Sequence, residues 1–305
     1  MLSNETLLRR LERPVGPVDV VLDTDAYNEV DDQYAIAYLL RSAPDISTKA
    51  IYSAPFLNEK STSPEDGMLK SHAEILKVSS LCGRDDLHEF TFKGSNRFLP
   101  DEKTPVVSAA AEDLVKRAMA RPDDSPLYVL AIGAITNIAS ALLLEPAIAG
   151  RIVIVWLGGN SVDWPDNLEF NMTQDVAAAR IVFGSGAPIV QLPCQGVVTH
   201  LTVTKPELEH WLVGKNPLCD HLAGYTISET ESYAHGKPWS RVIWDIATVA
   251  WLRSDQFTCS RLMPIPVPEY DHRYGLSPDG HLYRYVYYVN RDAIFEDLFG
   301  LLTRR

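Results

Sequence analysis

The chain has 305 residues, of which 46% are hydrophobic and 22% are charged, and this composition is that of a globular protein large enough to bury a core without disulfide bonds. Its four cysteines lie far apart without a CxxC pair, which argues against a thiolate zinc site and favours a reducing cytoplasm. The formal net charge of −12 argues against nucleic-acid binding, because that function needs a basic surface.

The first sixteen residues are expected to form an N-terminal extension. Leu7, Leu8 and Leu11 predict a short amphipathic helix that ends before Pro14. The segment lacks the apolar core of a signal peptide, and no apolar run approaches the roughly 20 residues that a membrane span needs. We therefore expect a cytoplasmic protein that does not act at a membrane.

From Val18 onward, short apolar runs alternate with longer helical patterns. Continuously apolar strands indicate a parallel sheet covered by helices on both faces, so the sequence predicts an open, mostly parallel α/β fold. The C-terminal part is more helical, and the absence of a low-complexity linker predicts a single domain over residues 1–305. The expected strands are 18–23, 48–54, 127–132, 152–157, 188–192 and 283–289, and the expected helices are 31–41, 65–81, 106–120, 136–144, 174–183, 206–213, 218–233, 243–252 and one at the C-terminus.

Acidic residues gather where the first predicted strand meets the first predicted helix. Asp23 and Asp25 flank the end of the strand, and Asp31 and Asp32 open the helix. Ligands of open parallel sheets lie at the carboxyl ends of the strands, and carboxylates gathered there repel one another unless a proton or a cation bridges them. Oxygen ligands without nearby Cys or His select a hard cation such as Ca²⁺ or Mg²⁺. The alternative is that Asp31 only caps the helix.

Three later segments have the same character. LYVLAIGAITNIASALLLEP is a buried strand, a glycine turn and a helix, whose turn carbonyls could face a cation. DNLEFNMTQD concentrates Asn167, Glu169, Asn171 and Asp175 before a helix, where they suit the hydroxyls of a sugar; the alternative is that Thr173 or Asp175 only caps the helix. RVIWDIATVAWL places Asp245 at the front of an apolar helix, as a ligand or as an N-cap.

Taken in this order, these segments resemble the inosine–uridine-preferring nucleoside hydrolase family. DTD…DD resembles the family's D-x-D…D-D signature, GAITNIA with LEP resembles its G-x-L-T-N-[IL]-A…EP block, and GGN…EFN…D and VTH also have counterparts. The resemblance runs from about Val18 to near the C-terminus. It implies hydrolysis of the N-ribosidic bond of a nucleoside or a related riboside, a Ca²⁺ at the strand ends, a role in nucleoside salvage and a homo-oligomer, as a dimer or tetramer.

Carried over by position, the resemblance implies a set of metal ligands. These would be Asp25, Asp32 and Asp245, together with the main-chain carbonyl of Ile132. The cation would lower the pKa of a water molecule and hold the 2′- and 3′-hydroxyls. Asp25 would also act as the catalytic base that takes the proton from that water.

The resemblance also implies substrate-binding residues. Asp31 and Asn171 would bind ribose hydroxyls, Glu169 would reach the 5′-hydroxyl side, and Asn58 would match a ribose-contacting asparagine after the second strand. Two departures from the family concern this region. Five residues, AYNEV, separate Asp25 from Asp31 where three are usual, and Trp244 stands where family members that favour inosine and uridine carry a histidine before the last metal aspartate.

Trp244 cannot donate a proton to a departing base, so help for the base must come from elsewhere. Candidates are His235, Tyr225, Tyr233 and the aromatic faces of Trp239 or Trp244, although each of them could simply pack in the core or on the surface. Base stacking on an aromatic face tolerates any base. The sequence therefore leaves the base preference open.

Two other functions are compatible with the sequence. A DxD at a strand end also opens haloacid-dehalogenase-type phosphatases, in which Asp23 would be the nucleophile, but the acidic loop that this class needs later in the chain is missing. A sugar- or nucleoside-binding protein could keep the metal site and have lost turnover, as the longer loop and Trp244 would permit.

Overall fold

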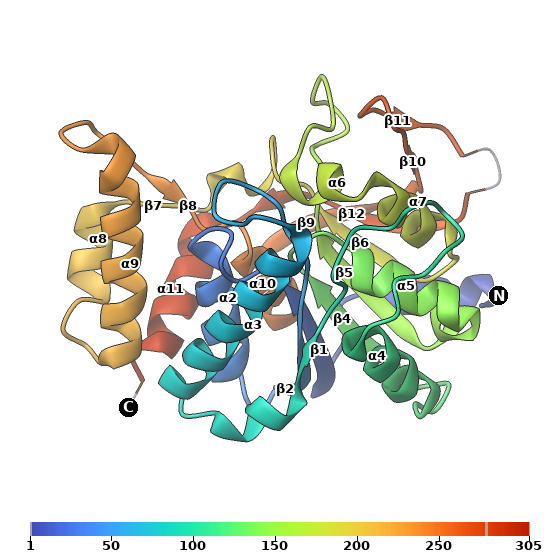
Figure 1. Cartoon of the computed structure of the whole chain (residues 1–305), viewed down its shortest axis with the longest axis horizontal. Helices are drawn as coiled ribbons and strands as arrows, with labels where there is room; N and C mark the ends of the chain where they lie inside the picture. The colour runs from blue at the N-terminus through green and yellow to red at the C-terminus, as the bar shows by residue number, and fades with distance from the viewer. Residues whose placement is uncertain (1, 278–279, 305) are drawn as a thin grey trace.

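A central sheet of eight strands organises the part of the chain that the computed structural model describes, residues 2–277 and 280–304 (Figure 1). Neighbouring strands are parallel, except that the last strand along the sheet is antiparallel to its neighbour. This confirms the predicted open, mostly parallel sheet. In spatial order the strands are β3 (Thr91–Lys93), β2 (Ile46–Ser53), β1 (Val18–Thr24), β4 (Leu127–Ala131), β5 (Ile152–Leu157), β6 (Ile189–Leu192), β12 (Leu282–Val289) and β9 (Thr258–Pro264).

Helices cover both faces of this sheet and bury a hydrophobic core on each (Figure 1). Successive side chains of a strand point to opposite faces, so Val20 and Leu22 of β1 belong to one core and Val21 to the other. The first core is covered by α2 (Asp31–Arg41), α3 (Pro64–Leu81), α10 (Ile246–Arg253) and α11 (Arg291–Leu302), and the second by α4 (Ala109–Met119), α5 (Thr136–Leu144) and α7 (Val176–Gly184).

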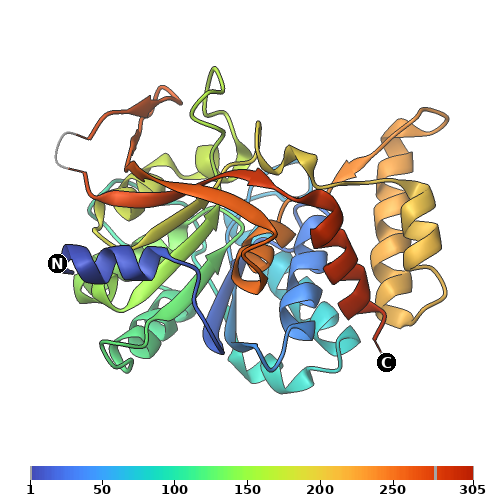
Figure 2. The same cartoon turned by 180° about the vertical axis from the view of Figure 1, so that it is seen from behind.

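The remaining elements lie around this three-layered body. Figure 2 shows α1 beside β12 and β9, and the paired helices α8 and α9 at the opposite end of the molecule. None of the helices in the described ranges is both long and apolar enough to cross a bilayer. These elements are α1 (Asn4–Leu11), α6 (Phe170–Gln174), α8 (Lys205–Trp211), α9 (Pro217–Ala234), the 3₁₀ turns Asp85–Phe90, Pro146–Gly150 and Val198–His200, and the short strand pairs β7 (Thr202–Val203) with β8 (Arg241–Val242) and β10 (Val267–Pro268) with β11 (Tyr274–Gly275).

The predicted elements are present, with small shifts that have local causes. The helix predicted over 174–183 corresponds to α7, which begins at Val176 because the Asp175 side chain caps it by accepting a hydrogen bond from Ala178 N, and the short α6 before it was not predicted. The helix predicted from residue 106 begins at Ala109, where the Ser108 side chain caps it. β9 and β3 were not predicted.

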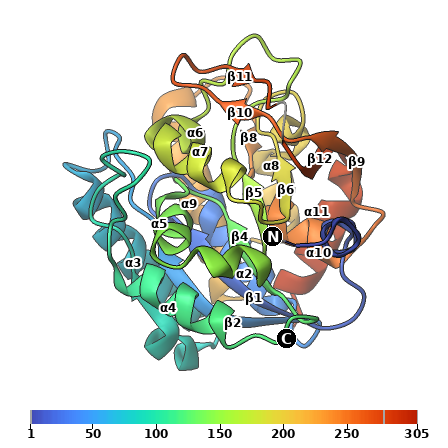
Figure 3. The same ribbon diagram turned by 90° about the vertical axis from the view of Figure 1, so that its right-hand side faces the viewer.

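The carboxyl ends of the parallel strands define one edge of the sheet. The segments that follow β5 and precede α6 rise above this edge, and β10 and β11 lie beside them in Figures 1 and 3. Loops after β1, β4, β5 and β6 therefore meet there, as expected for the ligand edge of an open parallel sheet.

Candidate active site

A cavity opens at this carboxyl edge and is lined by residues from five separate parts of the chain. Most of them directly follow a strand, and the others precede α6 or α10. The lining residues are Asp25, Asn28, Glu29, Asp31 and Asp32 after β1, Ile132 after β4, Leu157, Asn160, Leu168, Glu169, Phe170 and Asn171 between β5 and α6, Cys194 and Gln195 after β6, and Trp244 and Asp245 before α10.

The carboxylates of Asp31, Asp32 and Asp245 do not cap the helices that they begin. The N-cap position of α2 is Val30, so Asp31 and Asp32 already lie in the first helical turn. Asp245 stands at the N-cap of α10, but its side chain makes no capping hydrogen bond. The capping alternative is therefore wrong for Asp31, whereas Asp245 occupies the N-cap position of α10 without using its carboxylate as a cap, so neither helix end holds these carboxylates.

Three of these carboxylates converge on one point. Asp31, Asp32 and Asp245 are all buried, and each offers one oxygen within 4.8 Å of the others. Asp32 accepts a hydrogen bond of 2.5 Å from Thr24 Oγ1, and its carboxyl group also lies within hydrogen-bond reach of Asp245. Buried carboxylates at such separations require a proton or a cation between them.

The electrostatics of the cluster lead to the same conclusion. Burial, with the charge of Glu29 added, raises the pKa of Asp32 to about 7. Burial and the neighbouring carboxylates likewise hold the pKa values of Asp25, Asp31 and Asp245 well above their usual range. A divalent cation would remove this penalty, because it stabilises the ionised form of each carboxylate. The donor set therefore fits a hard cation.

Asp25 and Ile132 complete the predicted ligand set in the same cavity. Asp25 is 1% exposed, and its Oδ2 has no hydrogen-bond partner among the described residues. The Ile132 carbonyl accepts a hydrogen bond of 3.2 Å from Asn171 Nδ2. Gly133 follows at once, and a Cβ added there would lie 3.0 Å from Asp25 Oδ1. The absence of a side chain at Gly133 thus leaves room for the Asp25 carboxylate.

Asp23 lies outside the cavity, although the sequence grouped it with the other three aspartates after β1. In a strand, alternate side chains face opposite sides of the sheet, and Asp23 points to the α5 side. There Asn137 Nδ2 donates to Asp23 Oδ1 at 2.7 Å, and Asn137 Oδ1 accepts from Ser95 N at 2.7 Å. A phosphatase nucleophile must face the substrate, so this placement speaks against the phosphatase alternative.

The predicted sugar-binding residues Glu169 and Asn171 face the cavity at the start of α6. Glu169 is the N-cap of α6 and accepts hydrogen bonds from Asn171 N, Met172 N and Gly159 N at 2.8, 2.9 and 2.7 Å. Asn171 Nδ2 also donates to the Leu157 carbonyl at 3.0 Å. Both side chains are therefore held in place by the backbone of the sheet edge and of α6.

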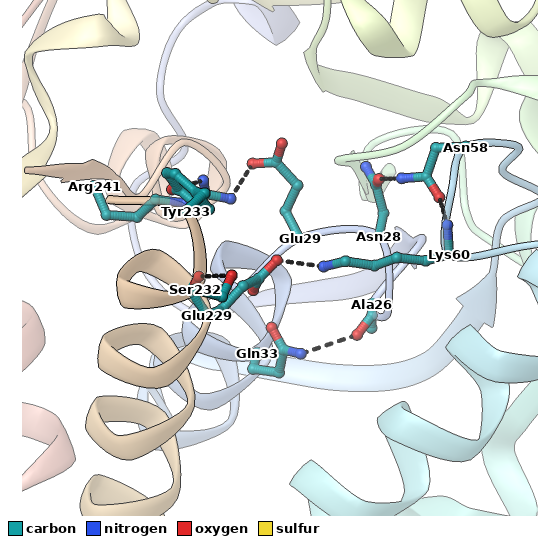
Figure 4. A network of polar contacts seen from close by, with 10 residues as sticks. All are labelled: Ala26, Asn28, Glu29, Gln33, Asn58, Lys60, Glu229, Ser232, Tyr233 and Arg241. Atoms are coloured by element: carbon teal, nitrogen blue, oxygen red, sulfur yellow. Dashed lines mark hydrogen bonds and ion pairs between the residues drawn. The ribbon is translucent and has the colours of Figure 1, made fainter. Parts of the chain in front are cut away.

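The other three predicted substrate-binding residues lie in different places. Trp244 lines the cavity, and its backbone N–H donates to Asp31 Oδ2 at 3.1 Å. Asn58 does not line the cavity, but its Nδ2 donates at 2.5 Å to Oδ1 of the lining residue Asn28 (Figure 4). His235 is exposed at the end of α9 and does not line the cavity.

Sequence reasoning missed several lining residues. Asn160, Cys194 and Gln195 follow β5 and β6, and their position directly after predicted strands was the signal that could have identified them. Asn28 and Glu29 lie within the longer loop, and no sequence signal showed that this loop turns toward the cavity.

The fold and the site together define a class of protein: an open α/β protein whose ligand cavity, at the carboxyl edge of the sheet, is built from carboxylates suited to a hard cation. The chain belongs to the inosine-uridine preferring nucleoside hydrolase family, whose model matches residues 20–277.

Three known proteins show what the chain is similar to. The chain is 27% identical over 264 residues to the pyrimidine-specific ribonucleoside hydrolase RihA of Enterobacter sp. This alignment covers 76% of this chain and 78% of RihA. A plant nucleoside hydrolase, PpNRh1, has a TM-score of 0.75 at 19% identity, covering 95% of this chain and 100% of the other. A purine-preferring ribonucleoside hydrolase from Gardnerella vaginalis has a TM-score of 0.73 at 20% identity, covering 93% and 99%. At these identities the two structures show a shared fold.

Proposed function

We propose that this protein is a metal-dependent hydrolase that cleaves the N-ribosidic bond of a nucleoside or related riboside to give ribose and a free base. The observation that carries the proposal is the convergence of Asp31, Asp32 and Asp245 within 4.8 Å, beside Asp25, in one cavity. Family membership and the ribonucleoside hydrolase named among its relatives support the same reaction.

The cation that we propose is Ca²⁺. The ligands would be Asp25, Asp32, Asp245 and the carbonyl of Ile132, which are all oxygen donors and line the same cavity. Ca²⁺ accepts many oxygen ligands in a flexible arrangement, whereas Mg²⁺ needs a smaller and more regular site. When bound, the cation would lower the pKa of a water molecule and orient the ribose hydroxyls.

The protein's own side chains would perform the other steps. The unpartnered Oδ2 of Asp25 can take the proton from the attacking water. Asp31 and Asn171 would bind the ribose hydroxyls, and Glu169 would hold the 5′-hydroxyl side. Positive charge develops on the sugar in an oxocarbenium-like transition state, and the surrounding carboxylates would stabilise it.

The test is release of reducing sugar from a panel of nucleosides, with and without a Ca²⁺ chelator. Asp25→Asn should lower the rate by at least about a hundredfold, because a positioned base contributes that much or more, while the thermal unfolding temperature stays near that of the wild type. The matched control is Asp124→Asn, since Asp124 is exposed and lies outside the cavity.

Wild-type turnover in the Asp25→Asn variant would remove Asp25 from the mechanism. Tight nucleoside binding without ribose release by the wild type would instead favour the non-catalytic binding protein. The cytoplasmic location, the role in nucleoside salvage and the homo-oligomeric state stay predictions that rest on the sequence and the family.

A further inference from the structure

The charge of the cavity lining is unusually one-sided. Its titratable side chains are six carboxylic acids and the thiol of Cys194, and none of the described lining residues is a histidine, lysine, arginine or tyrosine. The six acids are Asp25, Glu29, Asp31, Asp32, Glu169 and Asp245. One divalent cation cannot balance all of them, so the cavity stays attractive to positive charge.

Among the described lining residues, no histidine, lysine or tyrosine is present to protonate a departing base. The Glu29 carboxylate is ion-paired with Arg241 at 2.8 Å, and burial holds the pKa of the Cys194 thiol well above its usual range. Trp244 has only an indole N–H, which is a hydrogen-bond donor and not an acid. Glu169 accepts three backbone N–H groups, and the remaining carboxylates surround the proposed cation site.

A base that leaves without gaining a proton must leave as an anion, unless it carried a positive charge beforehand. We propose, on the basis of the function proposed above, that this site selects ribosides whose aglycone is a cationic ring bonded to ribose through nitrogen, such as a pyridinium or an N7-alkylated purine. In the step, the bond between C1′ and the ring nitrogen breaks, and its electron pair neutralises the ring. Water oxygen bonds to C1′, and the water proton goes to Asp25. The aglycone leaves neutral and needs no acid.

Two lining residues can recognise such a ring. The half-buried Trp244 lines the cavity and packs partly against the core, and a cation near an indole face is attracted by the ring quadrupole. Glu29 adds a carboxylate from the longer loop. Its Oε2 accepts from Arg241, while no hydrogen bond from a described residue reaches its Oε1 (Figure 4).

The loop that carries Glu29 is held from two sides before any ligand binds. Arg241 of β8 fixes Glu29 on one side, and Asn58 fixes the neighbouring Asn28 on the other (Figure 4). Lys60 then reaches across to Glu229 of α9 in an ion pair. A carboxylate held in this way loses little conformational freedom when it meets a cationic ring.

The matched substrates for the test are inosine and 7-methylinosine at mildly acidic pH, which differ by one methyl group and one positive charge. We expect kcat/KM for 7-methylinosine to exceed that for inosine at least by about the ratio of their uncatalysed hydrolysis rates. The reason is that the cavity offers no acid to compensate for the poorer leaving group of inosine. Inosine cleaved as efficiently as 7-methylinosine would overturn the inference and leave the proposed function intact. Cleavage of neither substrate, together with no ribose release from any nucleoside of the panel, would overturn the proposed function itself.

Variants of the two recognising residues locate the effect. Glu29→Gln keeps the shape and a hydrogen bond to Arg241, and should raise KM for 7-methylinosine about threefold relative to inosine, as expected for a partly exposed charge pair. The matched control Glu59→Gln, at an exposed position outside the cavity, should change neither KM. Trp244→His supplies an acid but removes the indole, so it should raise kcat/KM for inosine by about tenfold or more and lower the value for 7-methylinosine. If each of these two variants changed the kinetic constants of inosine and 7-methylinosine by the same factor, the preference for a cationic ring would not come from Glu29 and Trp244.

Discussion

Replacing Asp245 with asparagine should stabilise the cation-free protein. Unit charges less than 5 Å apart in a partly screened site repel one another by about 3 kcal/mol, and the oxygens of Asp245, Asp31 and Asp32 lie within 4.8 Å of one another. The substitution removes the charge of Asp245 at nearly unchanged volume. Allowing for partial protonation of the cluster, we expect a net gain of about 2 to 3 kcal/mol in the free energy of unfolding at about pH 8.

The same substitution should abolish stabilisation by the cation. Wild-type protein at a Ca²⁺ concentration of about 100 times Kd should gain about 2.7 kcal/mol. For a chain of this length, such a gain raises the unfolding temperature by about 4 °C. The gain of about 2 to 3 kcal/mol from the substitution is of similar size, so in chelator Asp245→Asn should melt about 4 °C above wild type. Calcium should not raise the unfolding temperature of this variant further.

Thermal unfolding of both proteins, in chelator and in calcium, measures all four values. Asp124→Asn, which removes an exposed carboxylate outside the cluster, serves as the matched control and should melt like wild type under both conditions. If Asp245→Asn melts below wild type in chelator, or still gains stability from calcium, the three carboxylates do not form a repulsive cation site.

Three further perturbations test the surroundings of the cluster. Asn137→Ala leaves the buried Asp23 carboxyl without its donor and should cost about 3 kcal/mol in denaturant unfolding; a loss below about 1 kcal/mol would contradict this role. Burial raises the pKa of Asp23 to about 7, so the folded chain holds a proton that the unfolded chain releases near pH 4. Stability of the protein in chelator should thus fall by up to about 1.4 kcal/mol per pH unit from this group between about pH 4 and 7 and then level off, and a pH series on Asp23→Asn should be flatter over that range. Gly133→Ala would press its Cβ against Asp25 Oδ1 at 3.0 Å, so kcat/KM should drop about tenfold with little change in unfolding temperature; full activity would show that Asp25 can shift freely.

The sequence predicts the central fold well because its strands are nearly pure apolar runs. All residues of β5, from Ile152 to Leu157, are buried, and such an apolar run between turns is a clear signal of a buried parallel strand. β9 lacks this signal. It lies at the edge of the sheet with exposed and half-buried residues along its length, so its sequence resembles that of a surface loop.

The candidate site was predictable only in part. Asp31 and Asp32 stand together in the sequence, and their place at the start of a helix after a strand gave a local signal. Asp245 lies far along the chain, and only the family resemblance linked it to them. The direction of Glu29 could not be predicted, because it depends on the ion pair with Arg241 and on a loop whose length departs from the family pattern.

The late position of Asp245 in the chain bears on how the protein is made. Asp31 and Asp32 are synthesised early, whereas Asp245, the third carboxylate, is synthesised only together with α10, which packs against α2. A nascent polypeptide thus has only two of these three acids and should bind the proposed cation weakly until α10 packs against α2. Binding of the cation would then stabilise the completed fold, so its removal should slow the last phase of refolding and leave the collapse of the early strands unaffected.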